Sequence, residues 1–205
     1  MNLTRWAQQL LNKNITMEDA LPTKMPVYVN SVVYLFGVSA LSALVMLIAS
    51  GVVMALFGPE WYHHSRIGLF VDAVHFWSVQ LFFGAIILHV MAKYAMAAWR
   101  DGRWKTWMMG ALIYGAAVFT GLTGYLSQTN WDSQWIALQS KDAMNALGIG
   151  FLFNPMNTGQ VLSLHMVVFP LIVVLLVLHH LFFIRRDSPV RPLPLTRSTH
   201  EPTIQ

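Results

Sequence analysis

Residues 75–89 read HFWSVQLFFGAIILH, and residues 165–180 read HMVVFPLIVVLLVLHH. Each of these apolar stretches begins and ends with histidine. His75 and His89 are fourteen positions apart, and the second interval is fourteen positions to His179 or fifteen to His180. At a rise of ~1.5 Å and a rotation of ~100° per residue, a step of fourteen positions advances about 21 Å along a helix and returns within roughly 40° of the starting face. The stretches therefore predict two helices, each with histidines at two depths on one face.

The composition indicates a membrane protein. The chain has 205 residues, of which 56% are hydrophobic and 11% charged, whereas soluble domains carry about 25% charged residues. It contains no cysteine, which excludes disulfides, cysteine-bound iron–sulfur clusters and thioether-linked haem within this chain. The polar N-terminal stretch has no short apolar core followed by a small-residue cleavage site, so we expect no cleavable signal peptide.

Four uncharged stretches have the length of ~20 residues that a helix needs to cross a bilayer. They are Ser31 to Phe57, Ala73 to Ala92, Thr106 to Leu126 and Val161 to Ile184. The sequence therefore predicts an all-α membrane protein whose residues 30–187 form a bundle of four transmembrane helices.

The distribution of basic residues predicts the orientation of this bundle. With four crossings both termini lie on one side, together with the loop between spans two and three. These segments hold 11 of the 13 lysines and arginines, and only Arg66 and Lys141 lie on the other side. By the positive-inside rule, the termini are cytoplasmic, or on the equivalent negative side. The net charge of +4 thus reflects membrane topology, and we expect no nucleic-acid partner.

The segments outside the bundle have their own patterns. In residues 1–29, Leu3, Trp6 and Leu10 fall on one helical face, which predicts an amphipathic helix in the membrane interface, with a frayed polar leader as an equal alternative. Residues 188–205 are proline-rich and predict an extended cytoplasmic tail. The loop 127–160 contains Trp131 and Trp135 and few charges, which favours short amphipathic helices on the outer membrane surface.

The predicted topology places the histidines of spans two and four at matching depths in the membrane. Spans two and four run in the same direction, so their histidines share two depths. We call His75 and His165 the outer level, and His89 with His179 or His180 the inner level. Ionisable residues inside a bilayer are costly and are by default functional candidates. Paired imidazoles on facing helices hold haem iron in helix bundles, which predicts a haem at each level. Interhelical hydrogen bonding is the structural alternative, and zinc is less suited because no carboxylate or thiol accompanies either pair.

Glycines repeat the same interval in the other two spans. Gly37 and Gly51 are fourteen positions apart in span one, as are Gly110 and Gly124 in span three. Glycine also permits close helix packing in membranes. Here the matched interval favours a second role, in which glycines give a flat macrocycle room at both depths.

In these features the sequence resembles the N-terminal half of cytochrome b, and in particular the short, split cytochrome b/b6 subunit of Rieske–cytochrome b complexes. The resemblance extends from about residue 28 to residue 193. It rests on the glycine pairs and on the following runs: His75-Phe-Trp-Ser, Leu88-His89-Val90, Thr123-Gly124-Tyr125, Leu164-His165 through Pro170 to His179-His180, and Ile184-Arg185-Arg186.

The resemblance implies two non-covalent b-type haems, stacked within the bundle. The outer, low-potential haem would be bound by His75 and His165. The inner, high-potential haem would be bound by His89 and His180, because in the split type this ligand lies ten residues after the proline and five before the arginine. The four glycines named above would face the macrocycles.

The family also implies a function. The chain would be the electron-transfer subunit of a quinol:cytochrome c (or other acceptor) oxidoreductase, located in an energy-transducing membrane and expected to be prokaryotic. Its implied partners are a Rieske iron–sulfur protein, a subunit-IV-like chain with the C-terminal half, a c-type cytochrome, quinol, quinone and lipids, in a dimeric complex. The chain alone would not oxidise quinol. The alternatives are a dihaem anchor of a hydrogenase or formate dehydrogenase, and a haem-free structural bundle.

Several positions depart from the family pattern. Where the family has arginines for haem propionates, this chain has Asp72 and Ala92, so Arg66, Lys93 and Arg185 become the candidate partners. The run 59–62 spells the family's quinol-site motif PEWY, but in the wrong loop, and we interpret it as coincidence. The family's Pro-Trp after the Gly-Tyr pair is replaced by residues 127–131, SQTNW, which changes this part of the quinol pocket.

Overall fold

All regular secondary structure in the described part of the chain is helical. The computed structural model describes residues 27–128, 130–187 and 190–191, and no strand occurs within these ranges. The elements in order are η1 (Val27–Asn30), α3 (Val32–His64), α4 (Arg66–Ala95), α5 (Trp104–Leu126), α6 (Trp131–Ala146), α7 (Thr158–Ser163), the π-helical turn η2 (Leu164–Val168) and α8 (Phe169–Asp187).

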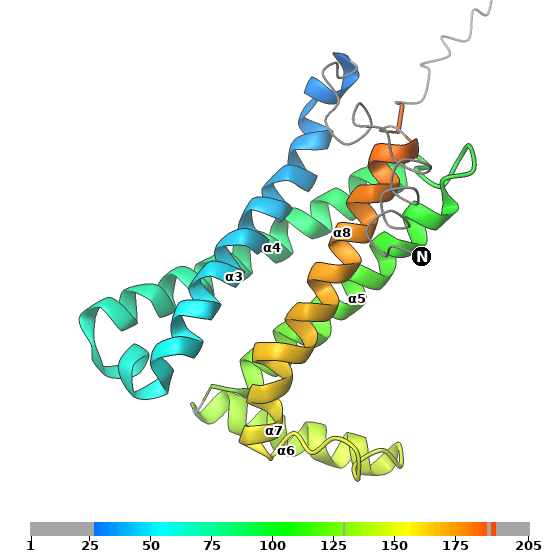
Figure 1. Cartoon of the computed structure of the whole chain (residues 1–205). Helices are drawn as coiled ribbons and strands as arrows, with labels where there is room; N and C mark the ends of the chain where they lie inside the picture. Colours follow the sequence, from blue (N-terminus) through cyan, green and yellow to red (C-terminus); the bar gives the residue numbers. More distant parts are fainter. Residues whose placement is uncertain (1–26, 129, 188–189, 192–205) are drawn as a thin grey trace, which may run out of the picture.

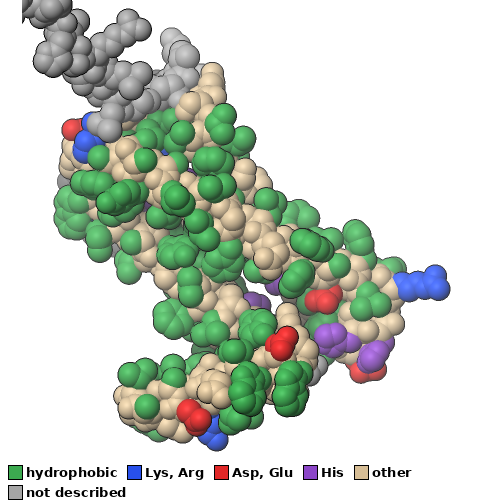
Figure 2. Space-filling model, turned by 180° about the vertical axis from the view of Figure 1, so that it is seen from behind, with side chains coloured by type: hydrophobic (Ala, Val, Ile, Leu, Met, Phe, Trp, Pro, Cys, Tyr) green, Lys and Arg blue, Asp and Glu red, His purple; other side chains and the backbone are tan. Residues whose placement is uncertain are grey.

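Four helices are long and apolar enough to cross a membrane: α3, α4, α5 and the continuous run Thr158–Asp187 formed by α7, η2 and α8. The predicted class, an all-α bundle with four spans, is confirmed. Many large hydrophobic side chains are exposed along the helices. On the face seen in Figure 2, hydrophobic side chains are spread along the length of the molecule, and the few charged side chains lie toward its ends. Apolar side chains on the outside are expected where the surrounding solvent is lipid.

The first helix is longer than its uncharged stretch. It continues to His64 through a kink at Gly58, whose φ of 79° is a conformation that glycine adopts without steric cost. Pro59 follows, at a position where proline is well tolerated because it begins a new helical turn. Ser65 then ends α3 and caps α4, and its hydroxyl accepts a hydrogen bond from the Gly68 amide at 2.9 Å.

The helices pack as two antiparallel pairs, α3 with α4 and α5 with α8 (Figure 1). Helices α4 and α8 run in the same direction, as predicted. In the described part of the chain their backbones are not closely packed against each other. The two histidine-bearing helices therefore face each other mainly through side chains.

The main core lies between the two histidine levels. It consists of Ala40, Ala43, Phe82, Ala85, Ile86, Ile113 and Ala117. Phe82 is seven residues from each histidine of α4, and Ala117 is seven residues from each glycine of the α5 pair. Two helical turns separate the core from each level, so an apolar layer divides the levels.

The loop between spans three and four forms helices, as expected. Asn130 caps α6, and its side chain accepts a hydrogen bond from the Ser133 amide at 2.9 Å. A smaller core of Leu126, Ala137 and Val161 joins α5, α6 and α7. Trp131 and Trp135 stack with ring centroids 6.4 Å apart and are 77% and 52% exposed. The predicted position of this helix on the membrane surface remains a prediction.

Two predicted segments fall outside the description. The amphipathic helix expected in residues 1–29 lies outside the described residues apart from η1. The proline-rich tail lies outside them apart from residues 190 and 191. The domain boundaries predicted at these ends remain predictions.

Candidate functional site: paired histidines and glycines

The outer level brings two imidazoles together from different helix pairs. His75 lies in α4 and His165 in the π-helical turn, and their ring centroids are 6.3 Å apart with an angle of 85° between the ring planes. Two bonds of about 2 Å from imidazole nitrogens to one metal ion, with about 1 Å from each nitrogen to its ring centre, add up to roughly 6 Å. The separation therefore suits one metal ion between the two rings.

Hydrogen bonds orient both outer rings. The Nδ1 atom of His165 lies 3.0 Å from the Thr120 carbonyl oxygen. A carbonyl only accepts, so Nδ1 carries the hydrogen and Nε2 keeps its lone pair. The Nδ1 atom of His75 lies 2.9 Å from the Ser50 hydroxyl, and that hydroxyl also donates to the Met46 carbonyl at 2.7 Å. The Ser50 oxygen is then the acceptor, which assigns the same tautomer to His75.

The inner level lacks such partners. His89 and His180 are close enough to interact electrostatically, and the Nδ1 atom of each ring is buried without a hydrogen-bond partner among the described residues. The ring of His180 faces the backbone of Thr106, but no hydrogen bond of ordinary geometry forms there. The two levels therefore have the same pair of residue types in different polar surroundings.

Each of the four predicted glycines lies against a different predicted histidine. A methyl group placed on the glycine would meet the ring at the following distances: Gly124 to His165, 2.6 Å; Gly37 to His89, 3.0 Å; Gly51 to His75, 3.3 Å; Gly110 to His180, 3.5 Å. In every case the nearest neighbour outside the glycine's own helix is the imidazole ring. The glycines thus first make room for the imidazoles, each within its own helix pair.

The geometry distinguishes His180 from its neighbour. His180 is partly buried and faces Gly110. His179 is exposed and packs edge-on against Phe183, with ring centroids 4.6 Å apart. His180 is therefore the residue that completes the inner pair.

The π-helical turn explains why the longer histidine interval of the fourth span can match the shorter one of the second. The Phe169 amide donates to the Leu164 carbonyl, five residues earlier, where an α-helix would use a carbonyl four residues earlier. One such turn absorbs one extra residue. Pro170 follows directly, and its ring would clash with a carbonyl in regular α-helical geometry. The turn therefore lets His165 and His180 face the same side.

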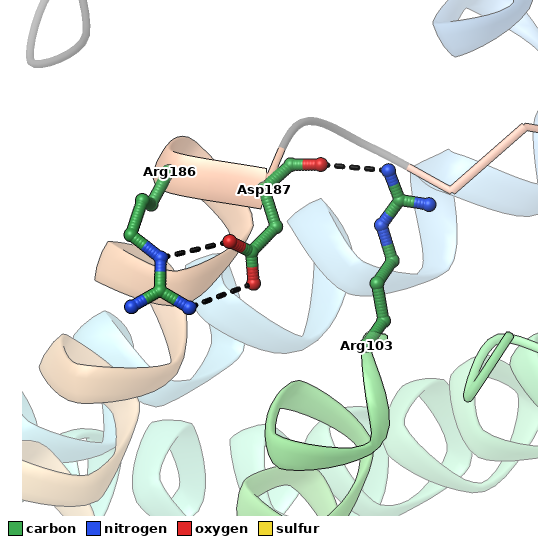
Figure 3. Close-up of polar contacts among 3 residues, drawn as sticks. All are labelled: Arg103, Arg186 and Asp187. Atoms are coloured by element: carbon green, nitrogen blue, oxygen red, sulfur yellow. Dashed lines mark hydrogen bonds and ion pairs between the residues drawn. The ribbon is translucent and has the colours of Figure 1, made fainter. Parts of the chain in front are cut away.

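Charged residues gather at the inner end of α5 and α8. Arg103 donates to the Asp187 backbone carbonyl at 2.7 Å, and Arg186 binds the Asp187 carboxylate at 2.8 and 3.2 Å (Figure 3). The Nε atom of Arg103 is buried without a partner among the described residues. Of the predicted propionate partners, Lys93 packs over the Tyr34 ring at 3.8 Å, and Arg66 and Arg185 are exposed.

Other predicted features fall outside this arrangement. The run 59–62 lies at the end of α3, where Glu60 and His64 pair at 3.6 Å with both side chains largely exposed. Within the described ranges, no group of three His, Cys, Asp or Glu residues is arranged to hold a metal ion.

The partners of the outer rings were not predicted from the sequence, although it contains a signal for them. At the outer level a hydroxyl residue precedes each glycine, as Ser50-Gly51 and Thr123-Gly124. At the inner level phenylalanine and methionine occupy these places. Thr123 is 2% exposed, and its hydroxyl lies 3.5 Å from the Nδ1 atom of His165.

Known proteins resemble this chain in sequence and in fold. No protein-family model matches the chain. It is 23% identical over 214 residues to cytochrome b6 of Heterocapsa triquetra and 26% identical over 210 residues to cytochrome b6 of Emiliania huxleyi, and each match covers 92% of this chain and 97% of the relative. Among solved structures, it resembles a chain of a hyperthermophilic respiratory Complex III with a TM-score of 0.72 and 21% identity.

That structural match covers 90% of this chain and 56% of the Complex III chain, so our chain spans little more than half of its length. The cytochrome b6 matches cover nearly the whole of both sequences. The chain therefore resembles cytochrome b6 along nearly its whole length, and its fold is that of the Complex III chain.

Proposed function

We propose that this chain is the dihaem electron-transfer subunit of a quinol-oxidising oxidoreductase complex. The observation that supports this most strongly is the set of four glycine–histidine contacts, two at each level, on helices that otherwise present apolar surfaces. A structural bundle has no need for four partly buried imidazoles at matched depths, because each costs desolvation in the membrane.

Haem b fits the residues at both levels. At the outer level the rings of His75 and His165 have the separation that one iron between them requires. Helices α4 and α8 are not closely packed along their backbones in the described part, which suits a flat group between the helix pairs. At the inner level, His89 and His180 complete the second pair.

Arg103 is our candidate partner for a propionate of the inner haem. Its Nε donor is buried without a partner among the described residues, and guanidinium groups bind carboxylates through paired donors. Lys93 is the second candidate, because it lies one helical turn beyond His89. Arg66 is our candidate at the outer level, where it begins α4.

When bound, each haem supplies a one-electron ferric/ferrous couple. The protein residues determine how this couple is used. His75 with His165, and His89 with His180, would hold the haem iron at the two levels and leave it no open position for substrate, so each group would only relay electrons. The histidine interval fixes the levels about 21 Å apart along the helix. The apolar core around Phe82 keeps polar groups out of the region between them.

Oxidation of a quinol releases two electrons and two protons. We propose that one electron passes to a Rieske iron–sulfur partner and the other enters at the outer level. From there it would pass to the inner level, where His89 and His180 would hold the second haem, and two electrons delivered in this way would reduce a quinone that takes up two protons from the cytoplasmic side. The transfer moves charge against the membrane potential, which amounts to ~2.3 kcal/mol per elementary charge per 100 mV.

The remaining parts of the site must come from other chains. Because the chain spans 56% of the Complex III chain that it resembles, we propose a subunit-IV-like partner with the C-terminal half. A c-type cytochrome or other acceptor would receive electrons from the Rieske protein, and the complex would be dimeric. The positive-inside pattern supports an orientation with both termini on the cytoplasmic side.

Purification of the chain from its native membrane in mild detergent tests this proposal. We expect two b-type haems per chain, with two separate midpoint potentials, together with a Rieske protein and a small helical partner. A complex that contains a nickel or molybdenum subunit would instead indicate an anchor of another enzyme. A preparation without a b-type absorption band would contradict haem binding altogether.

A further inference from the structure

The two levels differ in the hydrogen bonds that their histidine rings make at Nδ1. Both outer rings have a hydrogen-bond acceptor of ordinary geometry at Nδ1, the Ser50 hydroxyl for His75 and the Thr120 carbonyl for His165. Among the described residues the inner rings have no acceptor of ordinary geometry, although the His180 ring faces the Thr106 backbone. The asymmetry coincides with the sequence pattern in which only the outer glycines follow a hydroxyl residue.

We propose that Ser50 is a positioning residue that lowers the reduction potential of the outer haem relative to the inner one. The proposal deepens the proposed function, because it requires haem at both levels.

The contact between Ser50 and His75 is built into the helix pair. Ser50 is 6% exposed and lies on α3, 25 residues before the ring that it contacts on α4. Its hydroxyl donates back to the Met46 carbonyl, which leaves the oxygen lone pairs directed outward from its helix. Gly51 then lets the His75 ring approach, because an added methyl group there would already lie 3.3 Å from the ring.

The direction of the effect follows from the chemistry of a ligating imidazole. An acceptor at Nδ1–H makes the ring more basic at Nε2 and fixes its orientation. A more basic ligand stabilises the ferric state more than the ferrous state, so the potential falls. Hydrogen bonds to the ligating side chains are among the protein's means of setting haem potentials. Such an acceptor at the outer level, without a counterpart at the inner level, lowers the potential of the outer haem alone. Electron transfer from the outer to the inner level is then favourable.

The test is a redox titration of the intact complex with Ser50→Ala, read at the b-type absorption bands. We expect the midpoint potential of the outer haem to rise and that of the inner haem to stay unchanged. A tenfold loss of preference for the ferric state corresponds to about 59 mV for one electron. Ser50→Thr keeps the hydroxyl and should retain the wild-type outer potential.

Thr123→Val is the matched comparison. It removes a buried hydroxyl at the same level, but His165 keeps its bond to the Thr120 carbonyl. We therefore expect a smaller shift than for Ser50→Ala. If Ser50→Ala loses the outer haem, retention of that haem at the wild-type potential in Ser50→Thr still supports the role of the hydroxyl.

Three results would overturn the inference: an unchanged outer potential in Ser50→Ala, an equal shift of both haems, or failure of Ser50→Thr to restore the wild-type value. These results differ from a failure of the proposed function. In that case the wild-type complex itself would lack two haems, whereas here the wild type titrates as two components and only the variant deviates from expectation.

Discussion

The same substitution, glycine to alanine, can be made at all four glycines, where the added methyl group would lie at four different distances from the facing imidazole ring. An alanine methyl group at residue 124 would lie 2.6 Å from Cε1 of His165, whereas carbon atoms in favourable contact are about 3.5–4.0 Å apart. The overlap of about 1 Å must be relieved by moving the ring or the helix. Overpacking of this kind costs about 1–3 kcal/mol. Alanine returns about 0.5–1 kcal/mol of helix stability, so the net loss at this level is about 1–2 kcal/mol.

The other positions should follow in order of distance. The methyl group at Gly37 would lie 3.0 Å from the His89 ring, at Gly51 3.3 Å from His75, and at Gly110 3.5 Å from His180, which is ordinary van der Waals contact. Gly115, on the same helix as Gly110 and Gly124, has nothing within 4 Å of an added methyl group. It is the matched control and should gain slightly in stability.

Haem affinity measured separately for the two spectral components gives the readout. Because about 1.4 kcal/mol corresponds to a factor of ten, Gly124→Ala should weaken the outer haem about tenfold. Gly110→Ala should leave the inner haem within about twofold of wild type, since its contact is unstrained. Equal behaviour of Gly124→Ala and Gly115→Ala would refute the reasoning, and so would a loss of the inner rather than the outer component.

Two further predictions concern the second helix pair. His180→Ala should remove the inner haem and leave the outer one, whereas His179→Ala should leave both; a spectrum with the opposite pattern would assign the ligand to His179. Deletion of Val167 should return the π-helical turn to α-helical geometry and preserve both haems. Insertion of one alanine after Val174, combined with His179→Ala so that His179 does not take the place of His180, should rotate His180 by ~100° and remove only the inner component. Retention of that component in the combined variant would contradict the phase argument.

The two-level arrangement was predictable from sequence because it depends on helical period alone. A histidine interval and a glycine interval of equal length require no knowledge of neighbouring helices. The four spans were predictable for a similar reason, since apolar length is a local property. Both predictions needed only the order of residues along one segment.

The partners of the histidines were not predictable in this way. The contact between Ser50 and His75 depends on how far α3 and α4 are rotated toward each other, and this is set by packing around residues such as Ala43. The uncharged stretch predicted an end of the first span at Phe57, and the regular helix is interrupted directly after it, at the non-helical Gly58. The helical segment that continues from there to His64, and the cap at Ser65, were missed because they depend on backbone angles.

The backbone geometry of the fourth span decides between His179 and His180, a choice that the spacing of the histidines leaves open. In a regular helix, steps of fourteen and fifteen positions both return near the starting face, about 40° short and about 60° past it. Sequence alone therefore cannot choose between His179 and His180. The π-helical turn ahead of Pro170 absorbs one residue, so the longer interval takes the phase of the shorter one in α4. Proline and the additional residue thus act together, and the second histidine of the pair, rather than the first, faces Gly110.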